Sequence, residues 1–305
     1  VVVLVGLFAN VGGPAQQAMI ADLLPEDKRA QGFGLLRVVA NLCVAIGPII
    51  AGLLATRSYL PLFIGDAVTS LITAGIVCAL LRETKPAAHP GAQHETMLQT
   101  FRGYGAVAVD AKFTVLVAIS TLVVLVAMQM NTSLGVYLRD AHGVPNRQFG
   151  YILSLNATMV VLFQFYITRR MKGRRPFIML MLGSLLYGLG FGLYGFVSAY
   201  ILFLVAMVII TTGEMIVTPT SQALVAKMAP EDMRGRYMAV YGFSWVLPGI
   251  VGPLLVGLIM DNADPRWVWY GAGLAGLVAA TGFGLLHRWI GASLVAEGDP
   301  DSSSP

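Results

Sequence analysis

The sequence predicts an all-α membrane protein. Of its 305 residues, 56% are hydrophobic and only 12% are charged, and the mean hydropathy is +0.73. Soluble domains are about 45–50% apolar and about 25% charged, so a soluble domain of this size could not bury so much apolar surface. In addition, apolar stretches of about 20 residues, enough to cross a bilayer core of about 30 Å as helices, recur along the chain.

Nine stretches are expected to be transmembrane helices, because each is too long and too evenly apolar for a soluble strand. They are 1–22, 33–56, 59–81, 113–138, 148–168, 176–197, 199–226, 237–260 and 267–290. Glycine is frequent within them, which favours close helix contacts in a membrane. The sequence GFGLYG at 190–195 has the spacing of a dinucleotide-binding loop. It lies inside an apolar span with no strand before it, so we expect it to serve helix packing.

The connections between these spans alternate in charge. Most of the twenty Lys and Arg lie in every second connection, and the positive-inside rule places those connections in the cytoplasm. Residue 1 is then outside, and the C-terminus is cytoplasmic. The basic residues form no single stripe with interleaved aromatics, so nucleic acid is not an expected partner. The two Cys have no metal-ligand spacing, and we expect neither a metal site nor a cofactor.

One long polar connection divides the chain. Residues 1–82 are expected to form a partial N-terminal half, 83–112 a cytoplasmic linker with a short surface helix within 96–112, and 113–290 a C-terminal half. Residues 291–305 have the composition of a disordered cytoplasmic tail.

An internal repeat relates the two halves. The phrase Pro-Glu-Asp-x-Arg occurs at 25–29 and again at 230–234, each time between apolar spans. At the same offset, Pro14 matches Pro219. Both copies run span, loop, span in one orientation, which indicates a parallel repeat as in transporters built from two like halves. Matching six-helix halves would require three further spans before the first one present, so we expect nine of twelve spans here. The alternative is a natural nine-span protein.

These residues resemble the major facilitator superfamily, most closely its twelve-span drug/proton antiporter branch. ADLLPEDKRAQGFGLLRVVANLCVAIGPIIAGLL (21–54) is similar to the family's fourth and fifth spans. TTGEMIVTPTSQALVAKMAPEDMRGRYMAVYGFSW (211–245) is similar to the tenth span and the loop after it. AIGPIIAGLL (45–54) resembles the antiporter motif, but Cys43 and Ala51 replace two of its glycines. ITRRMKGRRP (167–176) occupies the place of the second cytoplasmic loop motif, without its acidic residue.

The resemblance implies two groups of residues at the contact between the halves. An antiporter-like interface motif, with the alternative of ordinary packing, comprises Gly47, Pro48, Gly52, Gly252, Pro253 and Gly257. A cytoplasmic gate, with the alternative of a solvated loop, comprises Asp22, Arg29, Arg234, Arg174 and Arg175. Several charge contacts that break together would act as a latch, since each charge near a helix end contributes about 0.3–1 kcal/mol.

Polar residues inside the spans are the candidates for a proton or substrate path. A mid-bilayer charge costs about 2.5–3.5 kcal/mol on insertion scales, so it needs a partner, water or a function. The candidates are Glu214, Asp66, Arg37, Asn41, Gln129 and Asn156. Glu214 is the preferred proton carrier; the alternative is a permanently bonded carboxyl that fastens two helices. Asp66 could instead lie solvated near the outer headgroups, and Arg37 could extend its guanidinium to the cytoplasm.

The sequence therefore predicts a monomeric secondary transporter of the bacterial plasma membrane. It would export small organic compounds in exchange for protons by alternating access of two halves. One alternative is a sugar, amino-acid or other metabolite transporter of the same superfamily. Others are a non-transporting membrane sensor or scaffold, and a membrane-embedded enzyme. The chain shows neither a paired-carboxylate, metal or nucleophile signature nor an ATP-binding loop.

Overall fold

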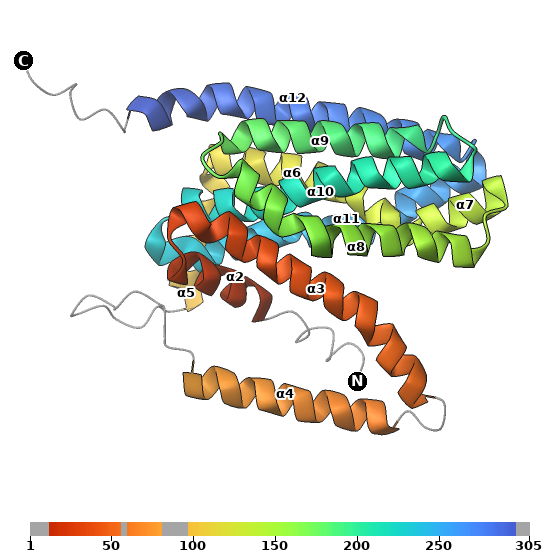
Figure 1. Ribbon diagram of the computed structural model, residues 1–305. Coiled ribbons are helices and arrows are strands. Elements are labelled where there is room, and N and C mark those ends of the chain that lie inside the picture. The colour runs from red at the N-terminus through yellow and green to blue at the C-terminus, as the bar shows by residue number, and fades with distance from the viewer. Residues whose placement is uncertain (1–11, 56–59, 81–96, 297–305) are drawn as a thin grey trace, which may run out of the picture.

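The computed structural model describes residues 12–55, 60–80 and 97–296, and within these residues all regular elements are helices (Figure 1). The all-α part of the predicted fold class is therefore confirmed, whereas the nine-span count and the two repeat halves stay predictions. The helices are α2 (Gly12–Leu23), α3 (Glu26–Ala55), α4 (Leu60–Leu80), α5 (Met97–Val109), α6 (Ala111–Thr132), α7 (Leu134–His142), α8 (Asn146–Met171), α9 (Pro176–Leu193), α10 (Tyr200–Met228), η1 (Glu231–Met233), α11 (Arg234–Asn262) and α12 (Arg266–Ala296).

Six of the described helices are long and apolar enough to cross a membrane, namely α6, α8, α9, α10, α11 and α12. The apolar part of α4, Phe63–Ala79, falls below that length. The first half of the predicted span 1–22 lies in 1–11, outside the described residues, and its second half lies in α2. The count of nine spans therefore stays a prediction for α2, α3 and α4.

The predicted span 113–138 is not one helix, because the chain breaks at Ser133 between α6 and α7. The Ser133 hydroxyl donates to Gln129 Oε1 at 2.8 Å, and the Thr132 hydroxyl donates to the backbone oxygen of Met128 at 3.0 Å. Such local hydrogen bonds compete with the helical ladder. The short α7 then ends at Gly143, whose φ of 64° favours glycine.

The linker holds the helix that was expected, and the last helix extends further than expected. The predicted short helix is present as α5, which packs against α6 and α11. Asp110, directly after it, accepts from the backbone N–H of Phe113 at 3.0 Å and from the Tyr237 hydroxyl at 2.9 Å. This carboxylate therefore caps α6 and fastens the linker to α11. At the other end, α12 continues through 291–296, which were expected to be tail; 83–96 and 297–305 lie outside the described residues.

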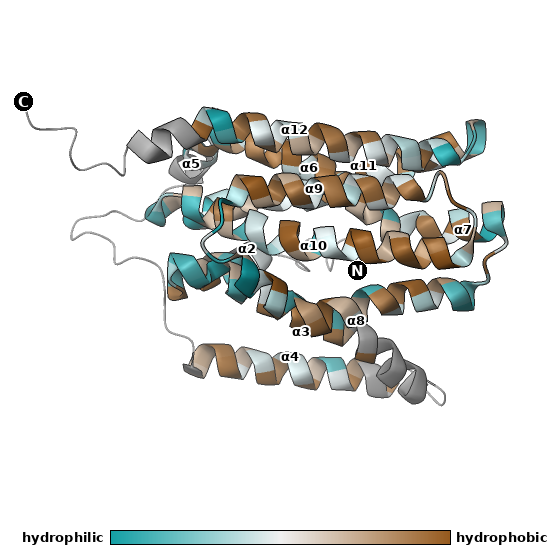
Figure 2. Cartoon of the chain, turned by 45° about the horizontal axis from the view of Figure 1, so that its top comes forward, coloured by the Kyte–Doolittle hydropathy of each residue, from teal (hydrophilic) through white to brown (hydrophobic). Residues whose placement is uncertain are grey.

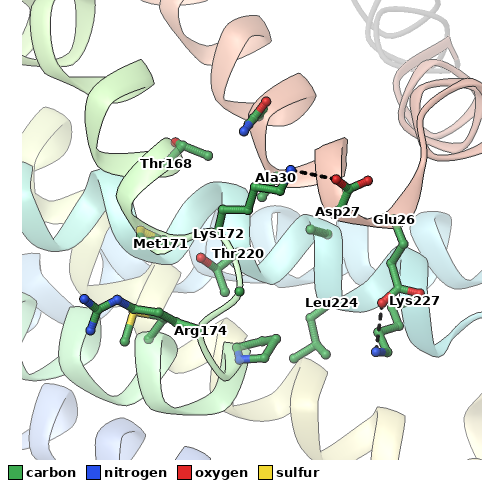
Figure 3. A pocket seen from close by; sticks show the side chains of 15 residues that line it. Glu26, Asp27, Ala30, Thr168, Met171, Lys172, Arg174, Thr220, Leu224 and Lys227 are labelled. Carbon is green, nitrogen blue, oxygen red and sulfur yellow. Dashed lines mark ion pairs between the residues drawn. The ribbon is translucent and has the colours of Figure 1, made fainter.

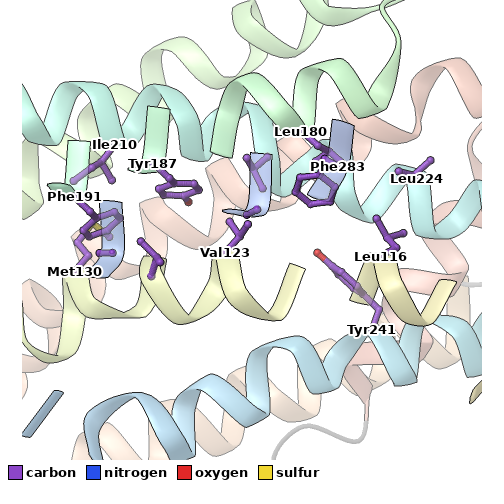
Figure 4. Close-up of a cluster of buried hydrophobic side chains, with 14 of the residues drawn as sticks. Leu116, Val123, Met130, Leu180, Tyr187, Phe191, Ile210, Leu224, Tyr241 and Phe283 are labelled. Atoms are coloured by element: carbon purple, nitrogen blue, oxygen red, sulfur yellow. The ribbon is translucent and has the colours of Figure 1, made fainter. Parts of the chain in front are cut away.

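Helices α6 to α12 form a bundle, here called the C-terminal bundle, and its core is built around α9. Figure 4 shows buried side chains of α6, α9, α10, α11 and α12 converging there, Tyr187 and Phe191 of α9 among them. A Cβ on Gly188 would lie 2.9 Å from the carbonyl oxygen of Gly273 in α12. A Cβ on Gly190 would lie 2.9 Å from the backbone nitrogen of Ile210 in α10. The glycines within 190–195 thus serve helix contact, as predicted.

The helices α2, α3 and α4, here called the N-terminal segment, lie to one side of this bundle (Figure 1). Helix α2 packs against α11, and α3 packs against α8 and α10. Helix α4 packs against α3 and stays exposed along its described side chains. Figure 2 shows hydrophobic residues along the lengths of the helices and hydrophilic residues concentrated near their ends, the pattern of membrane-spanning elements.

Candidate functional site

An ion pair joins α3 of the N-terminal segment to α10 of the bundle. The Arg37 guanidinium pairs with the Glu214 carboxylate, and Arg37 Nη1 also donates to the backbone oxygen of Glu214 at 3.1 Å. Only 10% of the Arg37 side chain and 18% of the Glu214 side chain is exposed. Removing one partner of such a pair would leave an uncompensated charge in a poorly hydrated place, which costs several kcal/mol.

Helix α8 supplies a third group to this cluster. Asn156 Nδ2 donates to Glu214 Oε2 at 2.7 Å and to Thr211 Oγ1 at 3.0 Å. The Thr211 hydroxyl itself donates to the backbone oxygen of Met207 at 2.7 Å. Asn156 and Thr211 are both buried. The Glu214 carboxylate therefore receives donors from two other helices, one charged and one neutral.

Arg37 retains an unused donor. Its Nε is enclosed and has no hydrogen-bond partner in the described part of the chain. Asn41, one turn further along α3, donates through Nδ2 to the backbone oxygen of Arg37 at 2.9 Å. Because buried donors are nearly always satisfied in native proteins, the unpaired Nε is an unmet hydrogen-bonding requirement of this closed cluster.

The structure brings together some of the residues that were predicted for a transport path. Arg37, Glu214 and Asn156 meet, and Asn41 lies beside them. Asp66 lies on the exposed helix α4, away from the cluster. Gln129 is buried in α6, where Nε2 donates to the backbone oxygen of Leu125 at 2.9 Å. Gln129 therefore serves local packing and is not brought to Glu214.

The interface motif is described only in its second copy. Gly252 is buried, and a Cβ there would lie 3.1 Å from Gln129 Nε2 in α6. A Cβ on Gly257 would meet nothing within 4 Å, and Pro253 is exposed. Gly252 therefore packs within the C-terminal bundle. The first copy consists of Gly47, Pro48 and Gly52 in α3. The surroundings of these three side chains are not among the described features.

A second group of charges lies where α2 ends and α3 and α11 begin, here called the charged end. Three ion pairs cross from the N-terminal segment to the bundle at this end, and Figure 3 shows two of them as dashed lines. The pairs are Asp22 with Arg234, Asp27 Oδ2 with Lys172 Nζ at 2.8 Å, and Glu26 Oε1 with Lys227 Nζ at 2.8 Å.

These pairs differ in burial. Asp22 and Arg234 are largely enclosed, whereas the side chains of the other two pairs are about half exposed, and exposed pairs contribute little each. The Lys172 ammonium lowers the pKa of Asp27 below 3.8. The stability that this lowered pKa contributes is fully present above pH 3.8, the ordinary pKa of an Asp carboxyl. It is lost only as the pH falls through the lowered pKa of Asp27. The pair of Asp27 with Lys172 therefore persists at physiological pH.

The predicted gate residues are only partly involved in these contacts. Asp22 meets Arg234, while Arg29 donates through Nε to the backbone oxygen of Ala21 at 2.9 Å within its own segment. Arg174 and Arg175 are exposed, and neither forms an ion pair among the described residues. Lys172, which is not among the predicted gate residues, provides the cation that pairs with Asp27. The sequence shows five cations at the connection between α8 and α9. Which of them faces α3 depends on the conformation of the turn between the two helices.

Next to these pairs, α3 closes tightly on α8. A Cβ on Gly34 would lie 3.1 Å from Thr168 Oγ1 and 3.5 Å from Gln164 Cγ. Gln164 Nε2 donates to the backbone oxygen of Met215 at 2.9 Å, which ties α8 to α10. A cavity of about 500 Å³ lies outside this contact, between α3, α10 and the turn from α8 to α9 (Figure 3).

The fold and this geometry define a class: a helical membrane protein whose two parts meet at a buried ion pair and at a set of terminal charge contacts. The chain belongs to the Major Facilitator Superfamily, whose family model matches residues 1–253 and 218–296. It is accordingly a multi-pass membrane transporter and not an enzyme.

Three similar proteins illustrate the range of the family. A Na(+), Li(+), K(+)/H(+) antiporter of Planococcus maritimus is 25% identical, over 94% of this chain and 72% of its own length. The class C tetracycline resistance protein of Escherichia coli is 24% identical, over 88% of this chain and 66% of its own length. A bacterial homologue of the iron transporter ferroportin, solved in an outward-facing state, superposes with a TM-score of 0.74 at 18% identity, covering 93% of this chain and 72% of that one.

Proposed function

We propose that this protein is a proton-coupled antiporter of a bacterial plasma membrane that exports small organic compounds by alternating access, with Glu214 as the proton-carrying group. One observation carries the proposal: a carboxylate within a span is held by a cation from the other part of the molecule. A buried carboxylate paired in this way is a typical functional group in transporters.

Proton uptake would act directly on the contact between the two parts. A neutral Glu214 no longer attracts Arg37, whose guanidinium would then be left as a buried charge without a partner. The favoured response is that α3 moves away from α10 or that water enters between them. Loss of the proton restores the pair. Proton occupancy of one carboxyl is thereby linked to the distance between the segments.

The packing supports a design of two parallel six-helix halves. In the repeat, α2 corresponds to α10 and α3 to α11. The contacts of α2 with α11 and of α3 with α10 are thus related by exchanging the copies. In this proposal the charged end faces the cytoplasm, as does the C-terminus. Its ion pairs then close the inner side while the substrate cavity is open outward.

The test is transport by the whole protein reconstituted in vesicles. Glu214→Gln keeps the shape of the side chain and removes its proton chemistry. We expect proton-driven efflux of a lipophilic cation such as ethidium to be lost, while exchange of the compound down its own gradient remains. Glu231→Gln, an exposed carboxyl at the charged end, is the matched control. Wild-type coupling in Glu214→Gln would overturn the assignment and favour the role of a fixed helix clamp.

A second candidate is exchange of monovalent metal cations for protons. The Planococcus maritimus relative is named for that activity. In this chain the Glu214 carboxylate and the Thr211 hydroxyl offer oxygen atoms within one cluster, in which both accept from Asn156 Nδ2; hard cations require oxygen ligands. Vesicles loaded with Na⁺, Li⁺ or K⁺ and a pH-sensitive dye separate the candidates. Proton movement driven by the metal ions alone, without an organic substrate, would favour this second function.

A further inference from the structure

A groove lies on the outside of the bundle, between the beginning of α9 and the second half of α12. Its volume is about 470 Å³. The residues that line it are Phe177, Ile178, Met181, Thr281, Gly284, Leu285, His287 and Arg288. Apolar side chains from both helices form its length, and no carboxylate lines it. The groove belongs neither to the Glu214 cluster nor to the charged contacts between the two parts.

The rim of this groove is cationic. Arg288 is exposed and forms no ion pair with any described carboxylate. His287 is held against the ring of Phe177, with ring centroids 5.8 Å apart, and its Nδ1 is enclosed without a hydrogen-bond partner among the described residues.

The first turn of α9 adds a second source of positive potential. Phe177 lies in that turn, so the helix N-terminus is level with His287. The residue before the helix, Arg175, is an exposed cation, and it makes no side-chain cap. Pro176 has no N–H, and the N–H groups of Ile178 and Met179 donate to the backbone oxygen of Arg175 at 3.1 and 3.2 Å. What remains is the positive end of the helix dipole, which favours a nearby anion.

We propose that this groove binds an anionic phospholipid, with the phosphate at Arg288 and His287 and one acyl chain along the apolar wall. The groove matches the two parts of a phospholipid: a cationic rim for the phosphate and an apolar channel for the acyl chain. Its walls face outward from membrane-spanning helices, where lipid is the surrounding medium. A free phosphate would use the rim alone and would gain nothing from Ile178, Met181 and Leu285.

The test measures which lipid contacts the rim. Trp289 is half exposed and directly follows Arg288, so bromine on a nearby acyl chain quenches its fluorescence. The protein is reconstituted in phosphatidylcholine that contains brominated phosphatidylglycerol, or brominated phosphatidylcholine for comparison. Subtracting the signal of Trp289→Phe isolates this site. We expect phosphatidylglycerol to be preferred, and Arg288→Gln to lower the preference about fivefold, since one cation near a membrane contributes about 1 kcal/mol.

Matched variants distinguish a specific lipid-binding site from general electrostatic attraction between the protein and anionic lipids. Arg266→Gln, at the other end of α12, should leave the preference unchanged, and Arg288→Lys should retain most of it. A Cβ on Gly284 would lie 3.5 Å from Met181 Sδ, so Gly284→Leu fills the groove, whereas Gly271→Leu projects into open space. We expect only Gly284→Leu to weaken quenching by both brominated lipids.

Three results would overturn the proposal. The first is a preference in Arg288→Gln equal to that of the wild type. The second is an equal loss in Arg266→Gln, which would indicate attraction to the membrane as a whole. The third is quenching in Gly284→Leu equal to that in Gly271→Leu, which would mean that no acyl chain occupies the groove. Circular dichroism of each variant checks that the helices are retained.

Discussion

Glu214 is bound by groups that reach it from two other helices. Arg37 comes from α3 and Asn156 from α8, while Glu214 itself lies on α10. These positions are 177 and 58 residues away from it along the chain. The same contact could act as a clamp or as a switch, and the distinction lies in whether the carboxyl exchanges its proton during the cycle.

A double-mutant cycle tests the energetic coupling of Arg37 and Glu214. Arg37→Gln alone should lower the free energy of unfolding by about 3–5 kcal/mol, because it leaves an unpaired buried carboxylate. The double variant Arg37→Gln with Glu214→Gln should recover most of that loss, since neither charge remains. Denaturant unfolding in detergent measures each variant. Strictly additive losses would show that the two side chains are not coupled in the native state.

The sequence identified these three residues because they are polar and lie within apolar spans. It did not show which residues would be their partners. A charge or an amide inside an apolar span needs a partner, and this argument selected Glu214, Arg37 and Asn156. It selected Asp66 and Gln129 equally well. Only the rotation and packing of the helices separate the residues that meet from those that do not, and the pattern of one sequence does not specify that rotation.

At the scale of elements, the glycines of α9 determine how closely it lies to its neighbours. Gly188 approaches the backbone of α12, and Gly190 approaches the backbone of α10. A helix with glycines on two faces can pack tightly against two partners at once. The core around Tyr187 and Phe191 depends on this approach (Figure 4).

Gly188→Val should disturb that packing. Its Cβ would lie 2.9 Å from the carbonyl oxygen of Gly273 and 3.1 Å from Gly276 Cα, so α12 must move away. Overpacking of this kind costs about 1–3 kcal/mol, and we expect a lower midpoint of thermal unfolding in detergent. Gly271→Val, whose Cβ would meet nothing within 4 Å, controls for the β-branched side chain. Equal midpoints for the two variants would contradict the close approach.

Element boundaries show where local chemistry overrides an apolar pattern. The stretch 113–138 is apolar enough to read as one span, yet α6 ends at Thr132 and α7 begins at Leu134. In contrast, the short helix within the linker was predictable, because its residues keep a helical composition between polar ends. Hydropathy locates a helix more reliably than it locates the helix ends.

On the scale of the whole molecule, the N-terminal segment and the bundle are joined most closely near the charged end. The ion pairs, the contact of Gly34 with α8, and the pair of Arg37 with Glu214 are the links that we describe. If transport proceeds by rocking, all of them must separate together. The two half-exposed pairs, Asp27 with Lys172 and Glu26 with Lys227, contribute little each and open easily. The enclosed pairs, Arg37 with Glu214 and Asp22 with Arg234, are the costly ones to separate.

A reversible cross-link tests this movement. Gly34→Cys with Thr168→Cys places two thiols in reach of a disulfide, because a Cβ on Gly34 lies 3.1 Å from Thr168 Oγ1. The exposed native residues Cys43 and Cys78 are first replaced by Ser. Oxidation should then stop transport, and a reductant should restore it. Gly75→Cys, whose surroundings are open, should not cross-link to Thr168→Cys. Full transport with the disulfide closed would exclude separation at this end.

The sequence alone determined that this protein is helical, that it resides in a membrane, that it belongs to a transporter superfamily, and that a phrase repeats in it. These properties follow from composition, from the length of apolar runs and from local motifs, all of which act over short distances along the chain. Only the tertiary structure decided which charges meet: Arg37 with Glu214, and Lys172 rather than Arg174 with Asp27. The physical reason is that an ion pair depends on separations of a few ångströms, which helix rotation and the path of each turn set only when the whole bundle is packed.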